Sequence, residues 1–421
     1  MPAMKNILED LKYRDLIEQC SNEENVAKML QNKQTIYCGF DPSATSMHLG
    51  NYVMISLLKR FQRAGHKVVA LVGGATGMIG DPSGKSKERN LQTKEALEAN
   101  TASIKAQLER YIDLSDPEKG VVVSNYDWLG QLSMIDFLRD YGKYFSINYM
   151  LSKEIVKSRL DAGISFTEFS YQILQSIDFY HLHHHYGVSM QLGGNDQWGN
   201  LTSGLELIRK IDGEEEEAEV MTAHLILRSD GKKFGKSEKG ALFLDRKLTS
   251  PYQLYQYFMN VTDEDAIRFL KIFSFLEKEE IEATAREHFA NPGMRIGQKK
   301  VAYEVTKDIH GKEAADEAVA MSQALFSGDV ASLSEEALQE LFGDLTVEIE
   351  EGLLLEDFLI QSGSATSKRE ARTFITGNSV AINGEKVTDL TKVITKADAL
   401  YGKYVVLKRG KKNYYLGKFK A

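Results

Sequence analysis

Cysteine is scarce in this sequence, with only Cys20 and Cys38 among 421 residues. Two thiols are too few for a disulfide framework, and their spacing fits no common metal site. We therefore expect both cysteines to be reduced and no zinc to be bound.

Long apolar runs are also lacking. No run approaches the roughly 18 apolar residues that a membrane-spanning helix needs. The first twenty residues, MPAMKNILEDLKYRDLIEQC, contain no basic start followed by an apolar core, so they do not resemble a secretion signal. We expect a cytoplasmic protein with no membrane partner.

Charge is distributed unevenly along the chain, whose net charge is −8. Residues 351–421 contain thirteen lysines and arginines against seven acidic residues, and residues 401–421 contain seven basic residues and no acidic one. Aromatic residues alternate with these cations, which is typical of a surface that binds RNA through phosphates and stacked bases. The alternative is a basic end that only aids solubility.

Residues 35–72 have the pattern of a strand, a helix and a second strand. TIYCGFD is a short apolar run, residues 49–64 carry apolar side chains at helical spacing and end before Gly65, and HKVVALVGG is again apolar. Uninterrupted apolar strands are typical of parallel sheets that are buried on both faces. The pattern predicts an α/β fold with a doubly wound, Rossmann-like parallel sheet.

The rest of the chain changes in composition along its length. A chain of this size, 43% hydrophobic, has room for two or three domains. Helices are expected over most of 90–186 and 250–327, and apolar strands at 188–194 and 223–228. An acidic stretch that ends at residue 350 indicates a linker. The tail after it predicts a small α+β module with a type I′ turn at Asn383-Gly384.

The stretch GGATGMIGDPSGKSKER, residues 73–89, has glycines before a Gly-Lys-Ser triplet at 84–86. A P-loop requires a glycine five residues before that triplet, and Ile79 stands there instead. Asp81 and Pro82 would bring a negative charge to the phosphate and remove a donor amide. The glycines fit better as space for a small substrate at the end of a strand, where Asp81 would meet an ammonium group.

Two further segments suit a nucleotide. The segment from His48 to Asn51, HLGN, begins a predicted helix, where free backbone amides can bind phosphate. The segment from Lys233 to Ser237, KFGKS, places two lysines three residues apart beside a glycine. Taken alone, the first could be only a capped helix start and the second only a polar turn.

Together these two segments resemble the HIGH and KMSKS signatures of the class I aminoacyl-tRNA synthetases. Five motifs, in the same order, narrow the resemblance to the bacterial tyrosyl-tRNA synthetases: YCGFDPSATSMHLG, LVGGATGMIGDPSGK, FTEFSYQILQSIDF, QLGGNDQWGN and KFGKS. The helical segment and the basic tail are similar as well, so the resemblance covers essentially the whole chain. Asn51 stands where the signature has its second histidine, and Phe234-Gly235 replace its Met-Ser.

The resemblance implies a tyrosine:tRNA ligase. L-Tyrosine and ATP would give tyrosyl-adenylate and pyrophosphate, and the tyrosyl group would then move to the 3′-terminal adenosine of tRNA(Tyr). It also implies Mg²⁺ with the ATP, no organic cofactor, and a homodimer. The implied domains are a Rossmann-like catalytic domain with a helical insertion over 1–230, the KFGKS loop with an α-helical anticodon-side domain over 231–330, a linker over 331–350, and a basic RNA-binding domain over 351–421.

The resemblance assigns residues to four tasks and assigns none to a metal. Catalysis would use His48, Asn51, Lys85, Arg89, Lys233 and Lys236. Tyrosine would be bound by Tyr37, Asp81, Tyr171, Gln175, Asp178 and Gln197. ATP would be bound by Cys38, Gly39, Asp41, His48, Gly50, Asn51, Gly194, Asp196, Lys233, Lys236 and Ser237. The tRNA would be bound by Lys368, Arg369, Arg372, Lys408, Arg409, Lys411 and Lys412.

The amino-acid-binding residues also have a helical spacing. Tyr171, Gln175 and Asp178 stand at i, i+4 and i+7, so they share one stripe of a helix. Three hydrogen-bonding groups on one face meet either solvent or a ligand. The resemblance favours a ligand, with Tyr171, Gln175 and Asp81 at the ammonium of tyrosine, and Asp178 and Tyr37 at its phenol.

The histidine cluster HLHHH, residues 181–185, could bind a metal. Because no cysteine lies near it, we interpret it as a polar surface. Trp128 and Trp198 are interpreted as packing residues.

Three other functions remain open. An RNA-binding protein that kept the synthetase fold and lost catalysis would bind RNA without forming an adenylate. A tryptophanyl enzyme is disfavoured by Tyr37 and Asp178, which suit a phenol. A nucleotide kinase would require the triplet at 84–86 to act as a P-loop.

Overall fold

The computed structural model describes residues 7–83, 91–157, 159–161, 163–231, 234–237, 240–410 and 413–420. The chain forms two compact units. The first contains the residues up to Thr249 together with Tyr257–Val305, and the second contains Ser250–Gln256 together with the residues from Thr306 onward. The expected domain boundaries at 230, 330 and 350 stay predictions. The division into two compact units is made on other grounds and does not test them.

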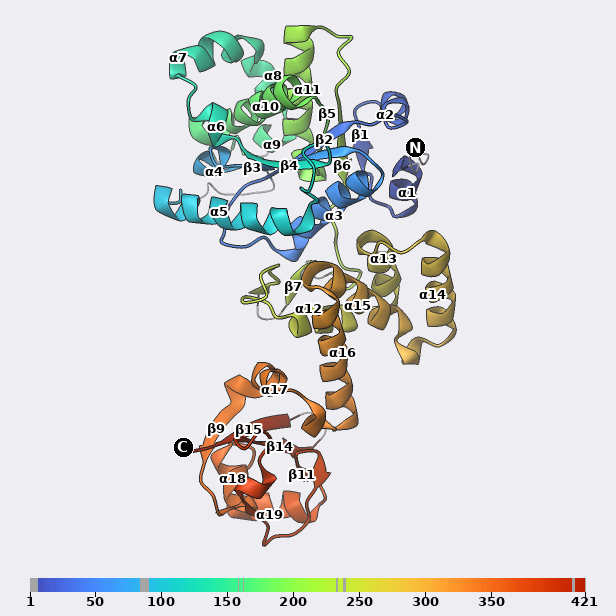
Figure 1. Cartoon of the computed structure of the whole chain (residues 1–421). Coiled ribbons are helices and arrows are strands. Elements are labelled where there is room, and N and C mark those ends of the chain that lie inside the picture. The colour runs from blue at the N-terminus through green and yellow to red at the C-terminus, as the bar shows by residue number, and fades with distance from the viewer. Residues whose placement is uncertain are drawn as a thin grey trace. The chain divides into compact units, whose positions relative to one another are not determined.

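A six-stranded sheet forms the centre of the first unit (Figure 1). The strand order is β1-β6-β5-β2-β3-β4, and all neighbours are parallel except β1, which is antiparallel to β6. The strands are β1 (Gln19–Cys20), β2 (Thr35–Phe40), β3 (Lys67–Val72), β4 (Gly120–Ser124), β5 (Val188–Gly194) and β6 (Glu219–Ala223). The expected α/β fold with a doubly wound parallel sheet is therefore confirmed.

Helices cover both faces of this sheet. Tyr37 of β2 and Leu71 of β3 pack with Phe179 and Leu201, which belong to helices α10 and α11 on one face. Helix α3 packs against β2 and β3, and α5 against β3 and β4. In Figure 1, α10 and α11 lie on one side of the sheet, and α3 and α5 on the other.

The helical segments of the first unit are mostly short between α5 and α10. The bounds are α1 (Ile7–Tyr13), α2 (Glu23–Met29), α3 (Leu49–Arg63), α4 (Thr76–Ile79), α5 (Lys94–Tyr111), α6 (Tyr126–Leu129), α7 (Met134–Asp136), a π-helical turn (Phe137–Tyr141), a 3-10 turn (Gly142–Tyr144), α8 (Ile147–Ser152), α9 (Glu154–Lys157), α10 (Phe166–Tyr186), a 3-10 turn (Asn195–Gln197) and α11 (Trp198–Asp212).

The middle of the chain is helical, as expected, with a two-stranded ribbon before it. The ribbon consists of β7 (Lys236–Ser237) and β8 (Gly240–Ala241), and the helices are α12 (Pro251–Met259), α13 (Asp263–Phe273), α14 (Lys278–Ala290), a 3-10 turn (Pro292–Met294), α15 (Ile296–His310) and α16 (Lys312–Ser327).

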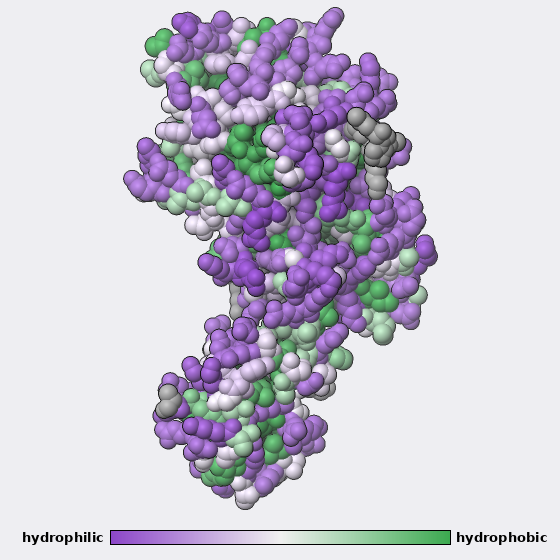
Figure 2. All heavy atoms as spheres, viewed as in Figure 1, coloured by the Kyte–Doolittle hydropathy of each residue, from purple (hydrophilic) through white to green (hydrophobic). Residues whose placement is uncertain are grey.

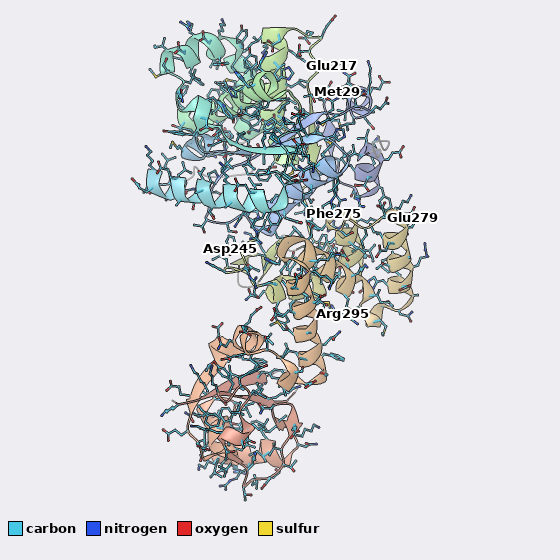
Figure 3. The ribbon with its side chains drawn as sticks, viewed as in Figure 1. Met29, Glu217, Asp245, Phe275, Glu279 and Arg295 are labelled. Carbon is cyan, nitrogen blue, oxygen red and sulfur yellow. The ribbon has the colours of Figure 1, made fainter. Side chains whose placement is uncertain are left out.

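Two buried arginines fasten α13 to the sheet domain within the first unit. Arg14 donates to the carbonyl oxygens of Lys271 and Leu276 at 2.7 Å, and Arg60 of α3 donates to that of Ile272 at 2.9 Å. These bonds satisfy carbonyls that the end of a helix leaves free. Phe275, labelled in Figure 3, lies under the guanidinium of Arg63 at 3.8 Å. This attachment explains why most of the helical middle belongs to the first unit.

The second unit is built on a five-stranded sheet of order β12-β11-β14-β15-β9. Its elements are α17 (Glu335–Phe342), β9 (Thr346–Ile349), β10 (Leu353–Leu354), α18 (Leu355–Gln361), α19 (Lys368–Thr376), β11 (Val380–Ile382), β12 (Glu385–Lys386), β13 (Val393–Ile394), β14 (Tyr404–Arg409), β15 (Asn413–Phe419) and 3-10 turns at Val330–Ser332, Gly343–Leu345 and Lys396–Asp398. The hairpin turn is as expected, because Asn383 and Gly384 both have positive φ, 50° and 93°.

The expected linker, residues 331–350, is folded. It contains α17 and β9, and both Leu338 and Ile349 are fully buried. Leu338 packs in a core with Val406 and Leu416 of the terminal hairpin. The many acidic residues of this segment made it look like a linker in the sequence. Its apolar residues are buried by the terminal hairpin, a contact that the sequence alone does not show.

The surface in Figure 2 is mostly hydrophilic, with hydrophobic residues gathered in separate small patches. Across the described part of the chain, no helix is both long enough and apolar enough to span a bilayer.

Candidate active site

A cavity of about 590 Å³ opens at the carboxyl ends of β2, β3 and β5. This is where a doubly wound sheet places its ligands. Fourteen of the residues assigned to tyrosine or ATP line it: Tyr37, Cys38, Gly39, Asp41, His48, Gly50, Asn51, Asp81, Tyr171, Gln175, Asp178, Gly194, Asp196 and Gln197. The fold therefore brings together residues that lie up to 160 positions apart in the sequence.

Some of the assigned residues are not placed by the structure. Lys85, Arg89, Lys233, Lys411 and Lys412 lie outside the described residues. Lys236, on β7, is described and exposed, and it is not among the residues that line the cavity. Ser237 ends the same strand.

The HLGN segment caps helix α3. The Nδ1 atom of His48 accepts a hydrogen bond from the backbone amide of Gly50 at 3.1 Å, and the Oδ1 atom of Asn51 accepts one from the amide of His48 at 3.1 Å. A Cβ atom at Gly50 would lie 2.9 Å from the His48 ring, so glycine is needed for this ring position. The first turn of α3 thus places an imidazole and a carboxamide at the rim of the cavity, while the amides of Leu49 and Gly50 are used in hydrogen bonds within the protein.

The KFGKS segment lies against the same helix start. The amide of Leu49 donates to the carbonyl of Leu242 at 2.8 Å, and the amide of Leu242 donates to the carbonyl of Gly235 at 2.9 Å. Phe234 lines the cavity and also stacks on Phe273 of α13, with ring centroids 5.1 Å apart. The two segments that suit a nucleotide are therefore neighbours.

The stripe on α10 faces the cavity and is buried. Tyr171 is 5% exposed and Asp178 is 1% exposed. The Tyr171 hydroxyl donates to Oδ2 of Asp41 at 2.8 Å. The polar groups of this stripe therefore line the cavity, and Tyr171 and Asp178 are shielded from solvent.

Asp178 is held by two donors from the segment after β4. Asn125 Nδ2 donates to its Oδ2 atom at 2.9 Å, and Trp128 Nε1 donates to its Oδ1 atom at 2.8 Å. Burial raises the pKa of Asp178 to about 8, although both hydrogen bonds act in the opposite direction. Trp128 and Trp198 both pack against the core, as interpreted, and the indole N–H of Trp128 in addition holds a carboxyl group of the cavity.

Asp81 is another carboxylate that lines the cavity. Its Oδ1 atom accepts from the amide of Ser83 at 2.9 Å, and its Oδ2 atom accepts from Gln197 Nε2 at 2.6 Å. Asn200 donates to Oε1 of Gln197 at 3.1 Å. A chain of hydrogen bonds therefore fixes the carboxylate at the edge of the cavity.

Three buried polar atoms of the cavity lining have no hydrogen-bond partner among the described residues. They are the hydroxyl of Tyr37 and the Oε1 atoms of Gln175 and Gln191. Unsatisfied buried groups are costly, so each indicates a polar group of a ligand. Gln191 was not predicted from the sequence. The available signal was an amide in the middle of the otherwise apolar strand VSMQLGG.

The two cysteines and the histidine cluster form neither a disulfide nor a metal-ligand group among the described residues. Both cysteines are free, and burial raises the pKa of Cys38 to about 12, which keeps its thiol protonated. No group of three or more possible metal ligands is found among the described residues. Of the histidine cluster, His183 contacts the carbonyl of Val188 and His184 contacts Asp212.

The described basic residues assigned to tRNA lie on α19, which holds Lys368, Arg369 and Arg372, and on β14, which holds Lys408 and Arg409. Lys368 and Arg372 are both paired with Glu356. The Arg409 guanidinium lies 4.9 Å from the centre of the Phe374 ring, so the end of β14 adjoins α19. Lys368, Arg369, Arg372 and Arg409 therefore form one basic area, and Glu356 partly offsets its charge. Lys408 faces the other side of the sheet, where its Nζ atom lies 4.9 Å from the centre of the Tyr414 ring.

Comparison with known proteins gives the same assignment for both parts of the chain. Residues 28–327 match the family of class I tRNA synthetases (W and Y), and residues 337–417 match the SYY-like C-terminal domain of tyrosine–tRNA ligases. Tyrosine–tRNA ligase of Bacillus caldotenax is 48% identical over 98% of this chain and 99% of its own length. Tyrosine–tRNA ligase 1 of Bacillus subtilis is 48% identical over 99% and 100%.

Solved structures agree. A C-terminally truncated mitochondrial tyrosyl-tRNA synthetase of Aspergillus nidulans, 30% identical, superposes with a TM-score of 0.69 over 76% of this chain and 94% of its own. A tyrosyl-tRNA synthetase of Archaeoglobus fulgidus, at 16% identity, shares the fold with a TM-score of 0.55 over 74% and 99%. Near-complete coverage at 48% identity, together with the HLGN and KFGKS segments at one cavity, shows that the chain belongs to the bacterial tyrosyl-tRNA synthetase family of class I.

Proposed function

We propose that this chain is a tyrosine:tRNA ligase whose cavity in the first unit binds tyrosine and ATP together. It activates L-tyrosine with ATP to tyrosyl-adenylate and pyrophosphate, then transfers the tyrosyl group to the 3′-terminal adenosine of tRNA(Tyr). The observation that carries the choice of amino acid is the unpaired, fully buried hydroxyl of Tyr37 in the same cavity as the buried carboxyl of Asp178.

The phenol of tyrosine fits between these two groups. A phenolic hydroxyl both donates and accepts. It donates to Asp178, whose oxygens keep lone pairs beyond those used by Asn125 and Trp128, and it accepts from Tyr37. Phenylalanine makes neither of these two hydrogen bonds, at a loss of about 1–3 kcal/mol each, which corresponds to roughly 30-fold to 10⁴-fold discrimination.

The ammonium of tyrosine fits other acceptors of the same cavity. An ammonium has three N–H donors and no acceptor. Three acceptors line the cavity for it: the Asp81 carboxylate, Oε1 of Gln175, and the oxygen of Tyr171, whose proton is used on Asp41. Gln197 acts here by holding Asp81 in place.

ATP binds at the HLGN and KFGKS segments. The tyrosine carboxylate attacks the α-phosphorus, the bond from this phosphorus to the bridging oxygen breaks, and pyrophosphate leaves. A carboxylate is already ionised at pH 7, so no general base is needed and catalysis consists of positioning and charge stabilisation. His48, Asn51 and Lys236 serve the triphosphate, with Lys233, Lys85 and Arg89 assigned to it by family resemblance. Cys38, Gly39, Asp41, Gly50, Gly194, Asp196 and Ser237 are assigned to ATP in the same way.

Mg²⁺ is proposed as part of the ATP substrate. Since the described residues contain no group of three possible metal ligands, they suit an ion whose ligands are mainly the phosphate oxygens. Such an ion would reduce the negative charge of the triphosphate.

The tRNA is proposed to contact the basic area on α19 and β14. Arg369 is exposed and Arg409 is half-buried in this area, and Lys411 and Lys412 follow β14 in the sequence. Phosphate contacts of this kind give affinity rather than sequence preference.

A second copy of the chain is proposed as a partner, at a region around α7 and α8. Six large apolar side chains between residues 134 and 166 are at least 45% exposed: Met134, Ile135, Leu138, Ile147, Leu160 and Phe166. So much exposed apolar surface in one segment marks an interface.

A cytoplasmic location stays a prediction from the sequence.

The test is amino-acid-dependent exchange of labelled pyrophosphate into ATP, measured with each of the twenty amino acids. We expect exchange with tyrosine and much less with phenylalanine. Exchange with tryptophan instead, or none from folded protein, would contradict the proposal. Absence of exchange combined with tRNA binding would identify an RNA-binding protein that has lost catalysis.

A further inference from the structure

Trp128 has little local support for the hydrogen bond that it makes. It lies on α6, a helix of four residues that buries none of them and has no side-chain cap. Yet its indole N–H must point at Oδ1 of Asp178 across 2.8 Å. Contacts from outside α6 must therefore fix the plane of the Trp128 indole.

A stack of histidines supplies that support. The ring of His181 lies parallel to the indole of Trp128, with centroids 4.2 Å apart and planes 13° apart. His185 stacks on the other face of His181 at 4.1 Å and 14°, and its Nδ1 atom lies 3.0 Å from the carbonyl oxygen of His181. His181 is thus held between two rings.

The stack continues the amino-acid-binding stripe. Asp178, His181 and His185 stand at i, i+3 and i+7 on α10, so they share one face with Gln175. The same rigid helix therefore carries the carboxyl group that Trp128 binds and the ring on which Trp128 rests. Burial and the neighbouring imidazoles of His185 and His184 lower the pKa of His181 to about 4, which keeps the ring neutral at pH 7.

We propose that His181 is a positioning residue for amino-acid binding: stacked between Trp128 and His185, it orients the indole that holds Asp178. The inference rests on the proposed function, in which Asp178 binds the phenol of tyrosine. It gives the histidine cluster a role other than a metal site or a polar surface.

The experiment compares His181→Ala, which removes the ring, with His181→Phe, which restores a ring that can stack. His184→Ala is the matched control, because that ring contacts Tyr180 and Asp212. KM for tyrosine and KM for ATP are measured by pyrophosphate exchange, and tryptophan emission is recorded. Trp198, the other tryptophan of the chain, is unchanged in every variant.

We expect His181→Ala to raise KM for tyrosine by about 3-fold to 10-fold, the scale of one aromatic stack, while KM for ATP stays within about 2-fold. Its tryptophan emission shifts. His181→Phe returns both values to those of wild type, and His184→Ala changes neither. His185→Ala, at an exposed position where folding is not at risk, raises KM for tyrosine by a smaller factor.

Equal effects on both KM values, failure of folded His181→Phe to restore them, or unchanged KM for tyrosine in both His181→Ala and His185→Ala would overturn the inference. These results differ from failure of the proposed function itself. In that case wild type would show no tyrosine-dependent exchange at all, and the inference would fall with it.

Discussion

Gln197 and Asp81 are joined by a 2.6 Å hydrogen bond that runs from Nε2 to Oδ2. Gln197 follows β5 and Asp81 follows β3, while β2 lies between these strands in the sheet. The bond therefore joins two cavity-lining segments that follow different, non-adjacent strands of the sheet.

Replacing Gln197 by methionine removes the hydrogen bond that holds the Asp81 carboxylate in place. Hydrogen bonds to charged groups are worth about 1.5–3 kcal/mol, so we expect KM for tyrosine to rise by about 10-fold or more and KM for ATP to change little. Gln62→Met is the control, because Gln62 binds the carbonyls of Asp113 and Lys119 away from the cavity. Unchanged tyrosine kinetics in Gln197→Met would show that Asp81 needs no such support.

Replacing Gly235 by alanine should slow pyrophosphate exchange. Its φ is 71°, and a Cβ atom would lie 3.3 Å from Leu49 at the start of α3. The left-handed conformation costs about 1–2 kcal/mol for an L-residue. We expect Gly235→Ala to slow pyrophosphate exchange by about 5-fold to 30-fold and to leave calorimetric binding of tyrosine unchanged.

The control for that variant is Gly187→Ala, which has φ 65° and open space around it, at the end of α10. It carries similar backbone strain without contacting the HLGN segment. If both variants slow exchange equally, strain anywhere in the first unit is responsible, and the special role of Gly235 is excluded.

Asp178 should make stability depend on pH. Burial raises the pKa of Asp178 to about 8, against roughly 3.9 in an unfolded chain. Between these values the folded state holds the extra proton, so its contribution to the free energy of unfolding falls as pH rises from 4 to 8. Relative to wild type, Asp178→Asn should gain stability with rising pH, by up to about 1.4 kcal/mol per unit.

Urea unfolding of the first unit at pH 5, 6.5 and 8 measures this difference. Asp140→Asn is the control, because the hydrogen bond from Arg139 lowers the pKa of Asp140 and moves its titration below this range. Parallel pH profiles for wild type and Asp178→Asn would mean that Asp178 is ionised throughout.

Charge reversal on the basic area should separate the two reaction steps. We expect the double variant Arg369→Glu and Arg409→Glu to bind tRNA at least about 10-fold more weakly. The slope of log affinity against log salt should fall by about 1.4–1.8 if two phosphate contacts are lost. Tyrosine-dependent pyrophosphate exchange should not change. Lys386→Glu on β12, outside this area, is the control, and equal loss of both steps would contradict the separation.

The sequence predicted the parts of the fold that depend on local patterns. The strand at 188–194 and the turn at Asn383-Gly384 follow from apolar runs and from glycine chemistry, and the structure has them as expected. The last strand was expected at 223–228 but spans Glu219–Ala223. An acidic residue is unusual in a buried strand, and Glu219 is accommodated by Asn25 and Ser21, which lie some 195 positions earlier.

Long-range contacts explain what the sequence could not show. The stripe on α10 was visible from its spacing, but its partners Asn125 and Trp128 come from a separate segment without a periodic pattern. Arg14 donates to carbonyl oxygens at the end of α13, more than 250 positions later in the sequence. The division of the chain into two units was therefore not predictable either.

The central claim is that Tyr37 and Asp178 together recognise the phenol of tyrosine. Its most direct test is the ratio of kcat/KM for tyrosine to that for phenylalanine, measured by pyrophosphate exchange in wild type, Tyr37→Phe and Tyr52→Phe. Tyr52 also has a fully buried hydroxyl without a partner among the described residues, but it does not line the cavity. We expect Tyr37→Phe to lower the ratio by about 5-fold to 150-fold and Tyr52→Phe to leave it unchanged. An unchanged ratio in Tyr37→Phe would contradict the account.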